Sequence, residues 1–337
     1  MIKKTDIIFL KKLTFRKVFN AVKIYLSYIF SIIFKFSKRW GYPVSISIEP
    51  TATCNLHCPE CPSGTDELTR FKGNIDFSLF RKVIDETAPY LLNLILYFQG
   101  EPFFNKDIFK LIEYASVKKK IYSVTSTNGH FLTAEIARKI VLSGLDKIII
   151  SLDGTTQETY ERYRRGGDLE TVLSGIRNLI SQREKLQSQT PIIVIQFLVF
   201  KFNEHEIEPV KELCKDLKVD RLELKSAQIY DFEKNSDLIP DIEKYSRYKK
   251  NANGKFEIKS KLKNHCRRLW EANVITNKGE VLPCCFDKDA KYSAGNVKEY
   301  KFSEIKNNIA AVSFREKLLK SRKQIDICRN CTEGLKK

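Results

Sequence analysis

Three cysteines within eight residues are the strongest chemical signal in this 337-residue sequence. Cys54, Cys58 and Cys61 form a Cys-x3-Cys-x2-Cys pattern directly after residues 43–48, which are typical of a strand. Three thiolates this close together can bind one metal centre. In a cubane of four irons they would leave one iron without a protein ligand. Such an open position can bind a chelating small molecule, as catalytic zinc sites keep a position for water or substrate.

Zinc is the competing metal for these three cysteines. Structural zinc usually takes four ligands arranged in Cys-x2-4-Cys pairs, and only His57 is at hand as a fourth. Because His57 stands between two of the cysteines, we expect its side chain to point away from them. The spacing therefore favours an iron–sulfur cluster.

The remaining cysteines indicate a second metal site. Nine cysteines without a secretory signal, in a chain of this length, favour metal binding over a disulfide framework. Gly279 fits a hairpin turn, and four cysteines could bind one centre: Cys266, Cys284, Cys328 and Cys331. Cys285 is an alternative to Cys284, and a structural zinc site is the alternative that the spacing permits. Cys214, on a predicted helix, is expected to be a buried core thiol.

The elements that must position these residues alternate between strand and helix. Strands are predicted over residues 43–48, 93–98, 121–126, 146–152, 192–200 and 221–224, and helices over 77–87, 108–117, 169–185 and 206–217, with a further helix opened by Thr133 as N-cap. Such alternation predicts parallel βαβ units with right-handed crossovers. Six units fall short of the eight in a closed barrel, so the fold class is α/β, a partial (β/α)6 TIM-like barrel.

Polar residues follow several of the predicted strands, where barrels of this kind carry their active sites. They are Gln99-Gly100-Glu101-Pro102 after the second strand, Thr127-Asn128-Gly129 after the third, Ser151-Leu152-Asp153-Gly154 after the fourth, and Arg164 thirteen residues past Ser151. Each could serve only as a turn, cap or surface residue. Together with the cysteine triplet they predict one site.

With the triplet and these strand ends, the chain resembles the radical S-adenosylmethionine (SAM) superfamily over about residues 43–226. The resemblance implies a [4Fe–4S] cluster on Cys54, Cys58 and Cys61 that cleaves SAM to a 5′-deoxyadenosyl radical. It assigns the methionine amine to the segment Gln99-Gly100-Glu101, and ribose hydroxyls or that amine to Ser151 and Asp153. It assigns the methionine carboxylate to Arg164, whose guanidinium fork suits it. Asn128 belongs to the same predicted set.

Two residues depart from the family pattern. Gln99 stands where the family's Gly-Gly-Glu motif has its first glycine. Glu60 stands where most members have an aromatic residue that contacts adenine. The sequence therefore leaves the adenine contact unassigned.

The C-terminal cysteines, in the order Cys…Gly-x4-Cys…Cys-x2-Cys, resemble the auxiliary-cluster domain called twitch, a reduced form of SPASM. The resemblance implies a second [4Fe–4S] cluster on Cys266, Cys284, Cys328 and Cys331. These patterns divide the chain into a basic, partly apolar N-terminal extension (1–42), a radical SAM partial barrel (43–226), a linker with some helix (227–262) and an auxiliary-cluster domain (263–337).

The charge is unevenly distributed. The formal net charge is +18, and residues 1–40 hold ten Lys or Arg against one Asp, or +9. The apolar run within this stretch, residues 24–34, is too short to span a bilayer. One interpretation is a basic amphipathic helix on a membrane surface, and the other is a helix that packs on the barrel. We expect a cytoplasmic protein, with membrane-surface association as the open alternative.

These patterns predict a radical SAM oxidoreductase or maturase that abstracts hydrogen and oxidises its substrate with help from the auxiliary cluster. The resembling family suggests a sugar- or aminocyclitol-like small molecule, or a peptide, and an electron donor such as flavodoxin or ferredoxin. The alternative is a zinc-stapled nucleic-acid-binding protein. The sequence argues against it, because it shows neither a basic patch interleaved with aromatic residues nor a recognition-helix pattern.

Overall fold

The computed structural model describes residues 4–331 and consists of two compact units, each built from separate stretches of chain. Unit 1 holds residues up to 53, residues 68–124 and residues from 262 onward. Unit 2 holds residues 54–67 and 125–261. The cysteine triplet therefore belongs to unit 2 and the C-terminal cysteines to unit 1.

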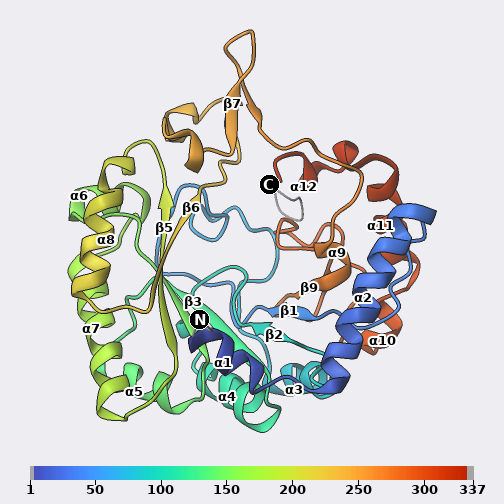
Figure 1. The fold of residues 1–337 in the computed structure, drawn as a ribbon, viewed down its shortest axis with the longest axis horizontal. Coiled ribbons are helices and arrows are strands. Elements are labelled where there is room, and N and C mark those ends of the chain that lie inside the picture. Colours follow the sequence, from blue (N-terminus) through green and yellow to red (C-terminus); the bar gives the residue numbers. More distant parts are fainter. Residues whose placement is uncertain (1–3, 332–337) are drawn as a thin grey trace. The chain divides into compact units, whose positions relative to one another are not determined.

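Unit 1 is organised around the strand that precedes the triplet. This strand, β1 (Ser45–Ile48), pairs in parallel with β2 (Asn93–Ile95) on one side and with β9 (Ala272–Ile275) on the other. β2 also pairs in parallel with β3 (Tyr122–Thr127), and β9 pairs antiparallel with β10 (Val281–Leu282). The C-terminal hairpin β9–β10 therefore extends the parallel sheet at β1 (Figure 1).

The helices of unit 1 come from all three of its stretches of chain. Along the sequence they are α1 (Lys4–Leu10), α2 (Phe15–Phe34), α3 (Phe77–Thr87), α4 (Ile108–Glu113) with a π-helical turn (Tyr114–Lys118), α9 (Arg268–Glu271), α10 (Phe302–Ile305), α11 (Ile309–Ser321) and α12 (Asp326–Arg329). Buried residues of α2, α9 and α11 share one apolar cluster, in which Tyr28, Trp270 and Phe314 are the aromatic members. This cluster ties the N-terminal helix to the C-terminal residues.

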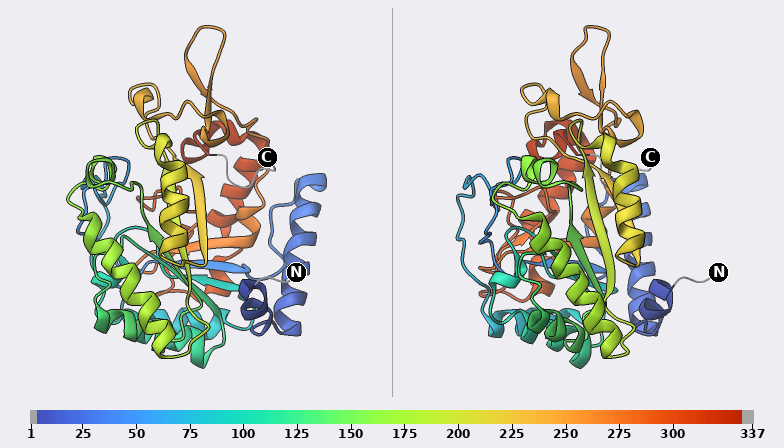
Figure 2. Two further views of the ribbon diagram at one scale, coloured as in Figure 1. Left: turned by 60° about the vertical axis from the view of Figure 1, so that its left-hand side comes forward. Right: turned by 90° about the vertical axis from the view of Figure 1, so that its left-hand side faces the viewer.

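Unit 2 continues the strand–helix alternation. Its strands β4 (Lys147–Ser151), β5 (Ile192–Val199) and β6 (Arg221–Ser226) pair in parallel and in chain order. The helices are α5 (Ala134–Leu142), α6 (Gln157–Tyr163), α7 (Leu169–Lys185) and α8 (Ile207–Asp216), and α5, α7 and α8 flank the strands (Figures 1 and 2). β4 and β5 are almost wholly buried, as their Ile and Val runs predict. The predicted α/β class with a parallel central sheet is confirmed.

Residues 227–262, predicted as a linker with some helix, carry structure of their own. They contain the hairpin β7 (Tyr248–Lys250) and β8 (Phe256–Ile258), and the short 3₁₀ turns Ser236–Leu238 and Glu243–Tyr245. Ile229, Ile239 and Tyr248 form a small buried cluster within this segment. The segment is part of unit 2 as far as residue 261, and the predicted domain boundaries stay predictions.

Candidate functional site

The triplet loop is a tightly wound turn. The Cys58 carbonyl accepts from the Cys61 amide (3.2 Å), and the Cys61 carbonyl accepts from the amides of Gly64 (2.7 Å) and Thr65 (2.9 Å). A Cβ on Gly64 would lie 2.5 Å from the Cys58 nitrogen and 2.7 Å from its oxygen, so this position requires glycine. The turn brings the three thiols onto one apolar cluster around Leu56, Tyr163, Phe200 and Ala227, with Cys58 buried and Cys54 and Cys61 partly exposed.

Arg164 and Asp153 contact this loop as a pair. The Arg164 Nε lies 2.6 Å from Asp153 Oδ2, and its Nη1 lies 3.8 Å from the Cys58 sulfur. Asp153 is fully buried, and its Oδ1 accepts from the Leu198 amide (2.7 Å). Burial opposes the charge of Arg164, but Asp153 and Cys58 outweigh it and raise the pKa of the guanidinium well above its usual value. The structure therefore holds a cation against the central thiol of the triplet.

Asn128 approaches the loop from the end of β3. Its Nδ2 donates to Asn55 Oδ1 (2.8 Å) and lies 4.0 Å from the Cys54 sulfur. Its Oδ1 accepts from the His130 amide (3.1 Å), and His130 Nε2 accepts from the Asp168 amide (2.9 Å). The sequence did not single out Asn55 or His130. The only signal was their position, since Asn55 follows Cys54 and His130 stands two residues after Asn128. Ser151 ends β4 and is buried.

Glu60, which replaces the family's usual aromatic residue beside Cys61, binds a neighbouring segment of the chain. One carboxylate oxygen accepts from the Tyr230 amide (2.8 Å) and the other from Asn235 Nδ2 (2.9 Å). Burial raises the pKa of Glu60, while these two donors favour its charged form. Glu60 thus fastens residues 230–235 to the triplet loop.

The segment Gln99-Gly100-Glu101 belongs to unit 1, where it packs on the backbone just before the triplet. Gly100 has φ +71°, and a Cβ there would lie 2.6–2.7 Å from backbone atoms of residues 51–53. The Glu101 amide donates to the Thr53 carbonyl (2.8 Å), and Glu101 is almost fully buried. The Gln99 amide donates to Glu49 (3.3 Å).

Glu49 itself is a residue that sequence reasoning missed. It is fully buried and bound by both terminal nitrogens of Arg70, each at 2.6 Å. This fork-to-fork pairing is the strong, directional form of a carboxylate–guanidinium contact. It fixes the end of β1, four residues before Thr53.

The auxiliary cysteines lie in an apolar setting. Cys266 and Cys328 are buried in the cluster with Trp270, and Cys284 packs against it, whereas Cys285 does not belong to it. Burial raises the pKa of Cys328 to about 11, and the charge of Arg322 opposes that rise. Burial, then Cys285 and, more weakly, Cys328 and Cys331 raise the pKa of Cys284 well above its usual value. These contacts favour Cys284 over Cys285 as the ligand.

Within residues 4–331, no three His, Cys, Asp or Glu side chains are close enough together to share a single metal ion. The cysteines of each group are neighbours but do not form a closed ligand sphere. The donor set of each group consists of thiols alone. Thiols are the ligands that iron–sulfur clusters take, so the residues fit such groups.

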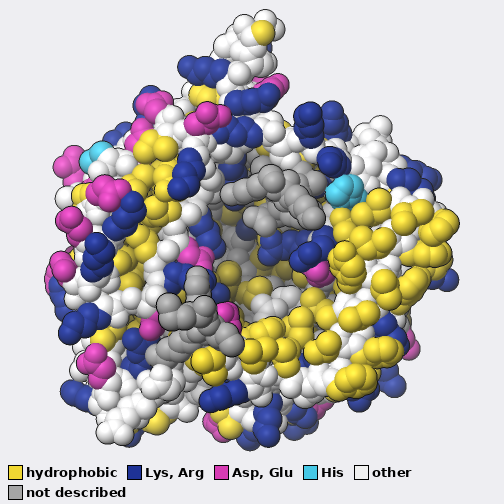
Figure 3. All heavy atoms as spheres, viewed as in Figure 1, with side chains coloured by type: hydrophobic (Ala, Val, Ile, Leu, Met, Phe, Trp, Pro, Cys, Tyr) yellow, Lys and Arg dark blue, Asp and Glu magenta, His cyan; other side chains and the backbone are white. Residues whose placement is uncertain are grey.

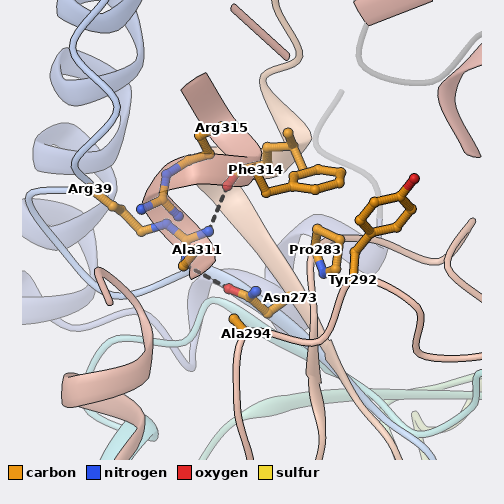
Figure 4. A pocket seen from close by; sticks show the side chains of 9 residues that line it. Arg39, Asn273, Pro283, Tyr292, Ala294, Ala311, Phe314 and Arg315 are labelled. Atoms are coloured by element: carbon orange, nitrogen blue, oxygen red, sulfur yellow. Dashed lines mark hydrogen bonds between the residues drawn. The ribbon is translucent and has the colours of Figure 1, made fainter. Parts of the chain in front are cut away.

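A small pocket in unit 1 is lined in part by Leu269 and Phe314, which belong to the apolar cluster around Trp270 (Figure 4). Arg39 donates to Asn273 Oδ1 and to the Leu269 carbonyl, each at 2.6 Å, and Arg315 donates to the Lys306 carbonyl (3.1 Å). Burial, with the charge of Arg315 nearby, lowers the pKa of Arg39 well below its usual value. Both guanidinium groups bind chain atoms, which is a structural role.

Two family models match this chain. A family model of the radical SAM superfamily matches residues 48–214, and a model of an iron–sulfur cluster-binding domain, SPASM, matches residues 266–332. The AdoMet-dependent heme synthase of Methanosarcina barkeri is 31% identical over 176 residues, covering 52% of this chain and 48% of that protein. The chain spans about half the length of this and other curated relatives that it matches.

Two solved structures share the fold. BtrN in complex with AdoMet and 2-DOIA aligns with a TM-score of 0.53 and 18% identity, covering 87% of this chain and 94% of BtrN. Streptococcus suis SuiB bound to its precursor peptide SuiA aligns with a TM-score of 0.60 and 15% identity, covering 87% of this chain and 72% of SuiB. At such identities the likeness concerns the fold alone.

Proposed function

Because this chain belongs to the radical SAM superfamily and carries a SPASM iron–sulfur domain, we propose that it cleaves SAM reductively and oxidises a substrate by two electrons. The two domains imply [4Fe–4S] clusters and SAM as cofactors. We assign Cys54, Cys58 and Cys61 to the SAM-binding cluster. The auxiliary cluster is assigned to Cys266, Cys284, Cys328 and Cys331. When bound, these groups would supply two things: an adenosyl radical, which takes one hydrogen atom from the substrate, and an acceptor for the electron left on the substrate. With release of a proton, an alcohol would thereby become a ketone.

The contact of Arg164 with both Cys58 and Asp153 carries this proposal. A guanidinium has five N–H groups in a rigid fork, and two of its nitrogens make these contacts. Asp153 fixes the fork through its own bond from the Leu198 amide. We therefore propose that Arg164 binds the methionine carboxylate and that Asp153 positions Arg164.

The other predicted contacts keep supporting roles in the proposal. The amide of Asn128 can donate to a cluster sulfur or a ribose oxygen, since it already lies 4.0 Å from the Cys54 sulfur. Ser151 offers a hydroxyl at the end of β4. The Gly100 turn presents backbone carbonyls, and Glu101 a carboxylate, that suit the methionine amine.

For the substrate we propose a small alcohol of the sugar or aminocyclitol class. The single group of four auxiliary cysteines supports it, as does the fold shared with BtrN over 94% of that chain. A peptide is the second candidate, supported by the fold shared with peptide-bound SuiB. We propose flavodoxin or ferredoxin as electron donor. Both matched models concern SAM or iron–sulfur chemistry, so the zinc-stapled nucleic-acid-binding alternative has no support from them.

The test is 5′-deoxyadenosine formation by anaerobically reconstituted protein after reduction with dithionite in the presence of SAM. We expect about eight irons and eight sulfides per chain, and product that disappears in Cys58→Ala. Cys214→Ala is the matched control, because Cys214 is a buried thiol of α8 that belongs to neither cysteine group. Zinc without sulfide, or equal product from both variants, would overturn the proposal. Deuterium transfer into 5′-deoxyadenosine then screens alcohols against peptides.

A further inference from the structure

Helix α2 is amphipathic in the reverse sense to a helix on a soluble protein. Its buried positions recur every three or four residues and are mostly polar: Lys17, Asn20, Ile24, Ser27, Tyr28 and Ser31. Its exposed positions are mostly apolar: Phe15, Val18, Phe19, Val22, Tyr25, Leu26, Phe30, Ile33 and Phe34. A surface helix in water normally buries its apolar face and exposes its polar one. The surroundings of α2 must therefore favour apolar groups on its outer side.

The buried polar side chains bind α2 to unit 1. Asn20 exchanges two hydrogen bonds with the Tyr42 backbone, both 2.9 Å. Ser27 donates to the Lys38 carbonyl (3.0 Å), and the Lys17 ammonium donates to the Lys120 carbonyl (3.1 Å). Rolling the helix would break these bonds and leave buried polar groups unsatisfied, which is costly. The apolar face is thus held outward by the fold.

The outward face extends beyond α2. Ile7 and Leu10 of α1 and, after α2, Phe36 and Trp40 are also exposed. Figure 3 shows the hydrophobic side chains gathered along this part of unit 1. The ring centroid of Phe30 lies 4.3 Å from that of Phe34, 5.8 Å from that of Phe36 and 5.3 Å from that of Trp40. A continuous apolar patch of this kind marks an interaction site on a soluble protein.

The charges around the patch identify its partner. Lys11, Arg16, Lys23, Lys35 and Lys38 are exposed. Asp6 is the only acidic residue among residues 1–40, and α2 has none. Basic side chains near apolar and aromatic ones match an anionic lipid surface, where the former meet headgroups and the latter the acyl boundary. A second copy of this basic chain would instead meet like charge.

The burial of α2 in unit 1 argues against its crossing the bilayer. α2 has 20 residues and a mean hydropathy of 1.4 in its most apolar stretch, which suffices by length and composition to cross a membrane. However, a third of that stretch is buried in unit 1, and Ile24 and Tyr28 belong to its core cluster. Crossing would require α2 to leave that core.

We propose that α2 lies in the plane of an anionic lipid surface, with its apolar face in the acyl boundary and its polar face holding unit 1 to the membrane. This inference is independent of the proposed catalytic function. It places the protein on the membrane surface with α2 in the interface and not across the bilayer.

Vesicle cosedimentation of the reconstituted full chain tests the proposal. We expect binding to phosphatidylcholine vesicles that contain phosphatidylglycerol, and weaker binding to phosphatidylcholine alone. Phe19→Ser with Leu26→Ser should lower the partition coefficient by about tenfold or more. The matched control is Val117→Ser with Ile309→Ser, which removes exposed apolar side chains elsewhere in unit 1 and should leave binding unchanged. Lys23→Glu, which spares the apolar face, should also lower binding by about tenfold.

Tryptophan fluorescence gives a second readout, because the chain has only two tryptophans. Trp40 is 44% exposed and Trp270 is fully buried. Binding to vesicles should shift the Trp40 emission to the blue, and brominated lipids in the vesicles should quench it. Trp40→Phe should abolish both signals while vesicles are still bound.

Three outcomes would overturn the proposal. They are absence of vesicle binding, a concentration-dependent dimer that masks the patch, and resistance to carbonate extraction as expected of a spanning helix. Formation of 5′-deoxyadenosine by the Phe19→Ser, Leu26→Ser variant without vesicles should stay at the unmodified level, which separates this test from that of the catalytic function.

Discussion

The two cysteine groups of this protein are built in opposite ways. Cys54, Cys58 and Cys61 come from one eight-residue loop in unit 2, and charged or amide side chains reach two of them: Arg164 at Cys58 and Asn128 at Cys54. The auxiliary cysteines come from three distant stretches of unit 1. Three of them belong to or pack against the apolar cluster around Trp270, and the buried Arg322 lies close to Cys328.

This difference matches two kinds of cluster. A centre with an open iron needs polar groups that can hold a charged ligand, and a short loop leaves one side open to it. A centre whose four positions are all filled by cysteine needs only thiols and exclusion of water. The contrast teaches that the surroundings of a cysteine group, more than the cysteines themselves, indicate its task.

The largest expected effect separates the two groups. Cys58→Ala should reduce 5′-deoxyadenosine formation below detection. Cys328→Ala should lose about four irons yet still cleave SAM, because in the proposed function its cluster accepts only the second electron. Iron content and 5′-deoxyadenosine measured on both variants check this. If Cys328→Ala also abolishes SAM cleavage, the division of tasks between the groups is wrong.

Removing the carboxylate that positions Arg164 comes next. Asp153→Asn keeps the side-chain volume but leaves a buried guanidinium without its counter-charge, at a cost of about 3–5 kcal/mol. We expect a lower Tm and a higher KM for SAM, with unchanged iron content. Asp220→Asn is the matched control, since it breaks the Arg183–Asp220 ion pair of the same unit. It should lower Tm without changing the KM, and equal KM values in both variants would refute the role of Asp153.

The tight turn of the triplet loop gives a smaller effect. Gly64→Ala places a Cβ against the Cys58 backbone and should cost about 1–3 kcal/mol. It should also lower iron incorporation into the SAM-binding site. In Gly254→Ala the new Cβ meets nothing within 4 Å, so only its φ of +74° matters, at about 1 kcal/mol. Thermal unfolding and iron analysis compare the two, and full iron loading of Gly64→Ala would contradict the packing argument.

The smallest effect concerns Glu60. Glu60→Gln replaces one acceptor oxygen by a donor, so one of its two bonds to residues 230–235 is lost, worth about 1 kcal/mol. The exposed Glu67→Gln should leave stability unchanged. Denaturant unfolding measures both. Loss of iron from Glu60→Gln would show that Glu60 does more than fasten this segment.

Local patterns predicted much of the fold. The helix over 169–185 and the cap at Thr133 appear as expected, because propensity and capping act within a few residues. The pairing of β9 with β1 could not be predicted, since it joins segments far apart in the chain. The apolar run over residues 24–34 indicated only part of α2, because Arg16, Lys17 and Lys23 precede it, although Lys17 turns inward to backbone carbonyls.

The site was predicted in its residues more than in its contacts. Motif spacing singled out the cysteines, Arg164 and Asp153, but the bond between Arg164 and Asp153 depends on where α6 ends, at Arg164. Glu49 gave no signal, because a lone glutamate at a strand end resembles any surface residue until its partner Arg70 is known.

The position of β1 between β2 and β9 has a consequence for synthesis and folding. Ser45 pairs with Asn93 on one side but with Ala272 on the other. During translation, one edge of β1 therefore stays without its partner until most of the chain has been made. Contacts of such long sequence separation form slowly. The strand that leads into the triplet is thus finished late, and an exposed strand edge is a site for chaperone binding or aggregation until then.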